Sequence, residues 1–153
     1  MQNDPQVTVA RLEAAVWEAD RHVLALEQAL ADWQALNPAT LDSIEQDPHS
    51  VRLVDQIVYR FTKLQDCLGE RVLPATLDKL MEPYEDRPMR DRLDRAEKLG
   101  LVSVDDWLRW RELRNRLAHE YPGRAEARWA ALCACVDASI ELVDAWRRWR
   151  AKL

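Results

Sequence analysis

Glycine is scarce in this chain, and its distribution excludes one large class of nucleotide-binding proteins. Only three glycines occur among 153 residues, and Gly69, Gly100 and Gly123 lie far apart. Phosphate-binding loops of the P-loop or dinucleotide type need closely spaced glycines, because the backbone itself must approach the phosphate. Nucleotide hydrolysis on such a loop is therefore excluded, and the three glycines are expected to be isolated caps or turns.

Histidine and cysteine are also sparse, and their spacing argues against a metal site. None of the three histidines stands at ligand spacing from another histidine or from a cysteine. A di-metal carboxylate site in a helical bundle would need Glu-x-x-His pairs, which the chain lacks. Cys133 and Cys135 would lie about 200° apart on a helix, so they cannot hold one ion together. We therefore expect no metal and no cofactor, and we expect the three cysteines to be reduced thiols of the core.

Long apolar runs are missing as well. No stretch of about 18 consecutive apolar residues occurs, as a membrane-spanning helix would require. The first residues, MQNDPQVT, lack the basic segment followed by an apolar run that marks a secretory leader. The expected protein is therefore cytoplasmic and has no membrane partner.

The net charge is −5, which argues against a protein that coats nucleic acid without specificity. Residues 1–50 carry nine acidic and two basic side chains, whereas residues 51–153 carry eighteen acidic and twenty basic ones. The second part is close to neutral and contains local basic clusters, one of which is formed by Arg109, Arg111, Arg114 and Arg116. This distribution is compatible with a small site for a polyanion.

Apolar side chains recur at helical spacing through most of the chain, and no segment alternates like a half-buried strand. Four long amphipathic helices are expected: from Val9 to the Asn37–Pro38 pair, from about Val51 to near Gly69, from Ser103 to Pro122, and from about Trp129 nearly to the end. Each apolar stripe must be covered by the other helices. The predicted fold is therefore all-α, an antiparallel bundle of four long helices with short connecting helices, in one domain spanning residues 1–153.

Shorter helices are expected in the connections. Thr40 is placed to cap a short helical turn that ends at Gln46. After Pro74, the segment ATLDKLM suits a helix capped by Thr76. The segment MRDRLDRAEKLG suits another helix, which ends with Gly100 in a left-handed conformation.

Two expectations concern side chains outside this helix pattern. Carboxylates of the first long helix, such as Glu13, Asp20 and Glu27, lie beside a seam of apolar residues and are expected to form a solvated face. The seven tryptophans are expected to pack in the core and at interfaces.

An arginine falls on the buried face of the third long helix. The sector expected to be buried, about 120° wide on a helical wheel, contains Trp107, Trp110, Leu113, Leu117 and Tyr121. Arg114 projects into this sector, while Arg109 and Arg116 point towards water. Because arginine cannot lose its proton at any reachable pH, a buried guanidinium needs a partner. Either a structural carboxylate such as Asp66 or Glu70, or a bound polyanion, would meet this need.

His119 does not share the direction of Arg114. The two side chains point about 140° apart on an ideal helix, and Asn115 lies on the line of His119. Arg114 and His119 can meet only if the helix unwinds before Pro122, or if a second copy of the chain brings its own motif alongside. Two simpler interpretations stay open: His119 as a favourable charge at the negative end of the helix, and Tyr121 as a plug of the core.

The string RNRLAHEY, Arg114 to Tyr121, resembles the R-x4-H-x-Y signature of HepT-like toxins in the HEPN superfamily. Upstream, the segment YRFTKLQDCLGERVLP, Tyr59 to Pro74, is similar to the second-helix segment of the same group. The signature stands at the end of the penultimate long helix and before a proline, in an all-helical frame. Together the two segments cover the middle and latter parts of the chain.

The resemblance implies a metal-independent endoribonuclease that acts as the toxin of a bacterial type VII toxin–antitoxin system, with an active site shared by the two chains of a homodimer. Its antitoxin would be a nucleotidyltransferase of the MntA type, which attaches AMP to the motif tyrosine, here Tyr121. Relatives with the same bundle include non-catalytic subunits that accompany nucleotidyltransferases. The alternative is therefore a non-catalytic subunit that binds such an enzyme and helps to present its substrate.

The motif supplies the groups that metal-free RNA cleavage needs, namely a base for the 2′-hydroxyl proton, an acid for the leaving oxygen and positive charge for the phosphorane. His119 suits the proton transfers because histidine gains and loses a proton near neutral pH. Arg114 suits the phosphate oxygens, and Asn115 can position His119 or the substrate. One histidine makes one proton transfer at a time, so a dimer that offers two suits the reaction. AMP on Tyr121 would fill the cleft with bulk and negative charge.

Overall fold

Residues 4–119 and 121–153 are described by the computed structural model, and their regular structure is entirely helical. The elements in chain order are α1 (Pro5–Leu36), α2 (Leu41–Glu45), α3 (Pro48–Cys67), the π-helical turn η1 (Leu68–Val72), α4 (Leu73–Lys79), α5 (Met89–Lys98), α6 (Val104–Leu117) and α7 (Ala125–Arg150). The all-α class expected from the sequence is confirmed.

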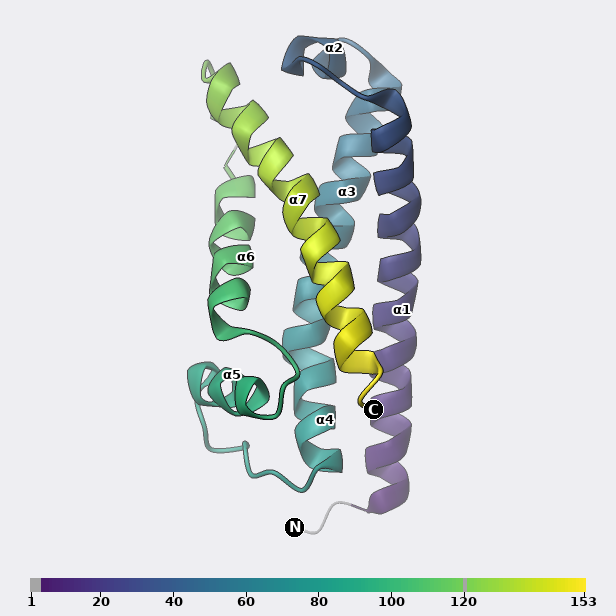
Figure 1. The fold of residues 1–153 in the computed structure, drawn as a ribbon, viewed down its shortest axis with the longest axis vertical. Helices are drawn as coiled ribbons and strands as arrows, with labels where there is room; N and C mark the ends of the chain where they lie inside the picture. Colours follow the sequence, from purple (N-terminus) through teal and green to yellow (C-terminus); the bar gives the residue numbers. More distant parts are fainter. Residues whose placement is uncertain (1–3, 120) are drawn as a thin grey trace.

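The long helices pack around an elongated core (Figure 1). α1 lies along the rod formed by α3, η1 and α4, and α7 crosses this layer and contacts α1, α3 and α6. α6 stands on the side of α7 that faces away from α1, and α5 lies across the lower end. Among the largest fully buried side chains are Phe61, Trp110, Trp146 and Trp149. At the upper end, α2 lies near the connection between α6 and α7, which carries part of the motif.

Helical spacing in the sequence identifies most of the buried faces correctly. On α1 the predicted seam is buried at Leu12, Ala19, Val23 and Leu26 and partly buried at Val16, Leu30 and Trp33. The prediction is wrong for Val9 of this seam and for Ile140 of α7, each of which is 49% exposed. Trp17 does not pack in the core, because it lies outside the seam of α1 and is 64% exposed, with Arg21 over its ring. Its packing at an interface stays a prediction.

Most helices begin or end at residues whose types favour helix capping. The predicted cap at Thr40 is confirmed, as is the left-handed conformation of Gly100, which has a φ of 71°. Asn37 caps the end of α1, and Ser103 caps the start of α6. α3 begins at Pro48, earlier than the predicted start near Val51. The cause is local, because Asp47 accepts backbone hydrogen bonds as the cap and proline is favoured in a first helical turn.

The expected helix end near Gly69 is wrong, because the chain continues from α3 through η1 into α4 without a break. Gly69 instead permits a close approach, since a Cβ built there would lie 2.9 Å from the ring of Trp107. Pro74 falls in the first turn of α4. Thr76 is not a cap, since its buried hydroxyl donates to the Val72 carbonyl oxygen of the same continuous helix at 2.7 Å.

Two carboxylates of α1 that were expected to be solvated tie α1 to α7. The indole Nε1 of Trp146 donates to Asp20 Oδ1 at 2.9 Å, and Arg150 Nε lies 2.9 Å from the other oxygen of that carboxylate. Glu27 forms an ion pair with Arg147. Because a buried indole N–H needs an acceptor, Asp20 contributes to the packing between the helices. The two carboxylate side chains remain 39% and 36% exposed, so the expected solvated face is present but is not free of contacts with α7.

The cysteines are free thiols, as expected, and two of them are buried in the core. Burial raises the pKa of Cys67 to about 12 and that of Cys135 to about 12. Cys133 is half-buried, so the prediction of a core position is wrong for this residue. Within the described residues, no helix combines the length and hydrophobicity needed to cross a lipid bilayer.

Candidate functional site

Arg114 lies on α6 at the edge of the buried face that the sequence predicts. Trp107, Trp110 and Leu113 of that face are buried. Arg114 Nη1 lies 2.7 Å from Asp66 Oδ1, near the end of α3, and 38% of the arginine side chain and 25% of the aspartate side chain remain exposed. The guanidinium therefore has one of the two carboxylate partners expected from the sequence, but it is not sealed inside the protein.

A small depression of about 160 Å³ surrounds this ion pair. Its lining includes Arg111 and the η1 residue Glu70, and π-helical turns often occur at functional sites. The Asp66 ion pair occupies one nitrogen of Arg114, and its guanidinium forms no other hydrogen bond or ion pair in the described residues. The other donors of the guanidinium therefore remain available to an anion.

α6 ends at Leu117, so the expectation that this helix continues through His119 to Tyr121 is wrong. The predicted unwinding before Pro122 does occur: Ala118 caps α6, and Tyr121 has a φ of 47°. Proline disfavours the right-handed helical conformation in the residue before it, which explains why the helix does not extend to Tyr121. The rings of His119 and Tyr121 lie edge to face, with their centroids 6.0 Å apart.

His119 and Tyr121 line a cavity of about 500 Å³ that is separate from the depression around Arg114. It is enclosed by α2, the first turns of α3, the α6–α7 connection and the start of α7. Its apolar lining comprises Leu41, Ile44, Val51, Val54, Val58, Leu117, Pro122, Ala131 and Leu132. His119 is exposed and Tyr121 is half-buried.

An ion pair between α2 and α7 closes one side of this cavity. Arg128 binds Glu45 with two nitrogens, at 2.8 and 3.2 Å, and its Nη1 also donates to the Tyr121 carbonyl oxygen at 3.1 Å. Arg128 therefore fixes the backbone of the connection that carries Tyr121. Neither Glu45 nor Arg128 could be predicted from the sequence, because no local pattern pairs residues so far apart in the chain.

One chain does not bring the predicted site residues together. Arg114 lines the depression between α3 and α6, whereas His119 and Tyr121 line the cavity near α2. Asn115 is exposed on α6, and in the part of the chain that the structure describes it forms no hydrogen bond with His119. Unwinding of the helix end is therefore not sufficient to join the arginine to the histidine.

The other two histidines have different surroundings. His22 is buried, and Arg60 Nη1 donates to its Nδ1 at 3.0 Å. Burial and the nearby Arg60 charge lower the pKa of His22. His49 is exposed in the first turn of α3. His119 is thus an exposed histidine that lines a cavity, which is the position that proton transfer to a ligand requires.

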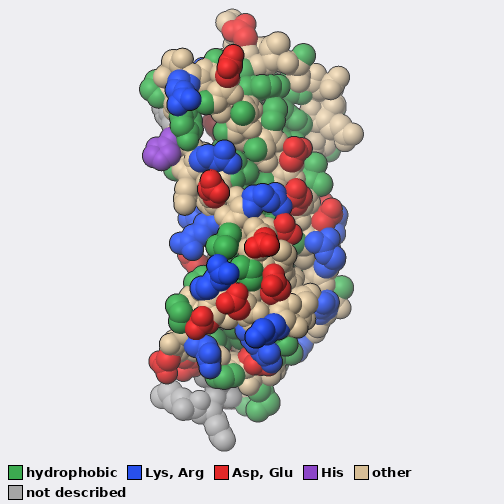
Figure 2. Space-filling view, turned by 60° about the vertical axis from the view of Figure 1, so that its left-hand side comes forward, with side chains coloured by type: hydrophobic (Ala, Val, Ile, Leu, Met, Phe, Trp, Pro, Cys, Tyr) green, Lys and Arg blue, Asp and Glu red, His purple; other side chains and the backbone are tan. Residues whose placement is uncertain are grey.

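Charge is mixed on the face drawn in Figure 2. Lys and Arg side chains alternate with Asp and Glu side chains across its middle, while hydrophobic side chains gather near the upper end. A broad surface of one sign, such as non-specific nucleic-acid binders use, is not seen on this face. Any contact with RNA here would be local.

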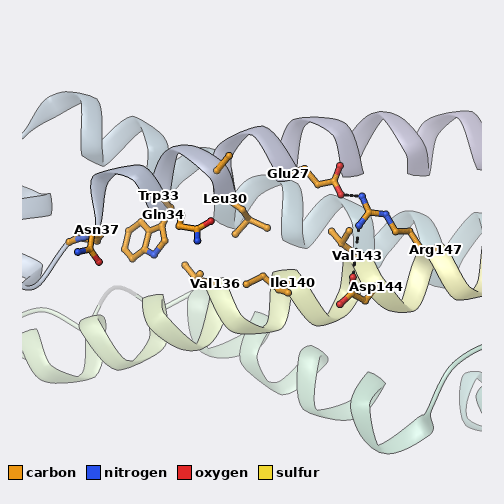
Figure 3. A pocket seen from close by; sticks show the side chains of 12 residues that line it. Glu27, Leu30, Trp33, Gln34, Asn37, Val136, Ile140, Val143, Asp144 and Arg147 are labelled. Carbon is orange, nitrogen blue, oxygen red and sulfur yellow. Dashed lines mark hydrogen bonds and ion pairs between the residues drawn. The ribbon is translucent and has the colours of Figure 1, made fainter.

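A further cavity, of about 600 Å³, lies between α1 and α7 and contains none of the predicted site residues (Figure 3). Leu30, Val136 and Ile140 form part of its wall. Its arginine, Arg147, is already paired with carboxylates of both helices. This cavity therefore offers apolar surface but no set of groups for acid–base chemistry.

No group of three or more His, Cys, Asp or Glu side chains is placed to hold a metal ion in residues 4–119 and 121–153. Comparison of the chain with protein-family models, with curated proteins and with solved structures finds no match.

Proposed function

We propose that the chain is the endoribonuclease toxin of a type VII toxin–antitoxin pair, acting in the cytoplasm as a homodimer. In this proposal residues 1–153 form one HEPN-like domain, in which the four long helices run antiparallel. The observation that carries the proposal is the R-x4-H-x-Y string, whose arginine and histidine both keep solvent exposure around the end of α6.

The proposed reaction is attack of a ribose 2′-oxygen on the adjacent phosphorus. The P–O5′ bond breaks, leaving a 2′,3′-cyclic phosphate and a 5′-hydroxyl. His119 takes the 2′-hydroxyl proton or gives a proton to the departing 5′-oxygen. Arg114 binds the non-bridging oxygens as negative charge builds up on them, with Asp66 holding its orientation. Asn115 positions His119 or the substrate.

A second copy of the chain completes the proposed site. The separation of Arg114 from His119 within one chain supports this arrangement, since neither residue alone provides both charge stabilisation and proton transfer. A twofold axis would set the arginine of one chain beside the histidine of its partner. It would also supply two histidines, one as base and one as acid.

Tyr121 is the proposed acceptor of AMP from an MntA-type nucleotidyltransferase. Its ring lies beside that of His119 and lines the same cavity, so a nucleotide attached there would block the imidazole. We expect Tyr121→Phe to abolish AMP transfer from the cognate enzyme, because phenylalanine has no hydroxyl to modify. The measurement is incorporation of radiolabelled AMP, and Tyr59→Phe, at an exposed tyrosine of α3, is the control. Undiminished labelling of Tyr121→Phe would remove this residue as the acceptor.

Expression in a bacterial host tests the toxin function. The wild-type chain is expected to stop growth and to fragment cellular RNA. Cells that express His119→Ala or Arg114→Ala are expected to grow normally and to keep their RNA intact. Arg116→Ala is the matched control, because it removes the same charge from an exposed position of the same helix and should stay toxic. All variants need equal expression, checked by immunoblot.

A non-catalytic subunit that binds a nucleotidyltransferase and helps to present its substrate is the second candidate. The Arg114–Asp66 ion pair favours it, because a guanidinium already neutralised by a carboxylate can be purely structural. Equal growth of the wild type and both variants, with intact RNA, would select this candidate over the nuclease.

A further inference from the structure

We infer that the cavity beside His119 binds a nucleobase of the RNA next to the cleaved phosphate, and that Asp55 favours bases that carry an exocyclic amino group. The link to cleavage rests on the proposed nuclease function. Binding of the base itself does not, because it depends only on the cavity.

The volume and lining of the cavity suit a small, mostly apolar group. Its volume of about 500 Å³ lies within the range of about 300–1,000 Å³ that is usual for small-molecule pockets. Aliphatic side chains of α2, α3 and α7 form most of its wall, among them Ile44, Val54 and Leu132. A nucleobase has apolar faces and a polar edge, so it fills such a cavity while its edge meets the few polar groups.

The polar groups of the lining differ in their availability. Glu45 and Arg128 satisfy each other. Asp55, on α3, lines the same cavity and takes part in no hydrogen bond or ion pair within the described residues. An ionised carboxylate only accepts hydrogen bonds, so it pairs with the amino group of cytosine, adenine or guanine. Uracil offers a carboxylate only its N3–H, which lies between two carbonyl oxygens that repel the negative charge, so Asp55 discriminates against it.

His119 connects this pocket to the chemistry. It lines the same cavity as Asp55, and a base held there carries its own ribose and phosphate to the mouth where the imidazole is exposed. The base in the cavity is therefore attached to a nucleotide whose 2′-hydroxyl or phosphate lies close to His119. Base identity at this one position then affects where the RNA is cut.

Equilibrium dialysis of the full-length protein against 3′-CMP and 3′-UMP tests the pocket. Because Asp55 is exposed, we expect a modest preference, with 3′-CMP binding about five- to tenfold more tightly than 3′-UMP. Asp55→Asn should remove this preference, because an amide both donates and accepts. Asp32→Asn, an exposed aspartate of α1, is the matched control and should keep the preference.

A second pair of variants tests the location. Ala131→Phe fills the cavity beside His119 and should lower the affinity for both nucleotides by about tenfold or more. Ala31→Phe fills the α1–α7 cavity and should leave both affinities unchanged. Circular dichroism and size exclusion establish that each variant folds and keeps its oligomeric state. Unchanged affinity of Ala131→Phe for both nucleotides would overturn the inference.

The experiments distinguish rejection of the nucleobase pocket from rejection of the nuclease function. Equal binding of the two nucleotides, or a preference that survives Asp55→Asn, overturns the pocket even if the protein cuts RNA. Conversely, an Asp55-dependent preference in a protein that cuts no RNA supports a nucleotide-binding site and rejects the nuclease function.

Discussion

Replacing His119 with alanine is expected to slow RNA cleavage by the purified protein by about 10²- to 10⁴-fold, the usual contribution of a positioned acid–base group. The effect is expected at His119 because this side chain is exposed and lines a cavity that a ligand can enter, whereas His22 is buried against Arg60. The measurement is the single-turnover rate on a short end-labelled RNA. His49→Ala removes the other exposed histidine and should retain the wild-type rate.

The same assay tests the proposed nucleophile. An RNA with one 2′-deoxynucleotide at the cut site should resist the wild-type protein, and the normal product should end in a 2′,3′-cyclic phosphate. A His119→Ala rate within about twofold of wild type would show that this imidazole transfers no proton in the limiting step. Cleavage of the 2′-deoxy substrate would reject attack by the 2′-oxygen.

Trp146→Ala is expected to lower the free energy of unfolding by about 3–5 kcal/mol, the range for removing a large buried aromatic side chain. Trp146 is 1% exposed, and its ring lies edge to face against Trp149 at a centroid distance of 6.1 Å. The substitution also removes the indole N–H that donates to Asp20, which ties α7 to α1. The variant therefore leaves both a cavity and a weakened helix contact.

Urea unfolding at one fixed protein concentration measures this loss, since dimer formation would make stability depend on concentration. Trp17→Ala is the matched control. It removes the same side chain from a position that is 64% exposed, and its effect should stay within about 0.5 kcal/mol. Similar losses for the two variants would contradict the assignment of α7 to the core.

Features of the fold that are encoded locally could be predicted from the sequence. Apolar residues at helical spacing locate the buried side of α1 from Leu12 to Leu26, and capping residues such as Thr40 and Ser103 locate helix starts. Both signals depend on neighbours within about one or two helical turns. The short connecting helices α2 and α5 follow from the same signals.

Tertiary contacts explain the predictions that failed. Gly69 looks like a helix end in the sequence, but its role is to admit the ring of Trp107 from α6. Asp20 looks like a surface carboxylate, but Trp146 of α7 donates to it from a position 126 residues away. Helical periodicity predicts which face of a helix is buried, but it does not predict which distant side chain packs against that face.

Some features of the candidate site could be predicted from the sequence, and others depend on tertiary contacts. The sequence itself contains the motif, and it predicts that a buried Arg114 needs a partner, for which Asp66 is one of two candidate carboxylates. The cavity beside His119 could not, because it depends on the Glu45–Arg128 pair, whose members are 83 residues apart. Nor does the sequence alone reveal that the end of α6 leaves Arg114 and His119 on different cavities.

The claim that one site is built from two chains is tested most directly by mixing two defective chains. Arg114→Ala and His119→Ala chains, carrying different tags, are co-expressed, and the mixed dimer is isolated through both tags. A shared site leaves one intact arginine–histidine pair across the twofold axis but only one of the two histidines, so the mixed dimer should cut RNA more slowly than the wild type and about tenfold faster, or more, than either parent dimer. A mixed dimer that forms and is as inactive as both parents would contradict the shared site.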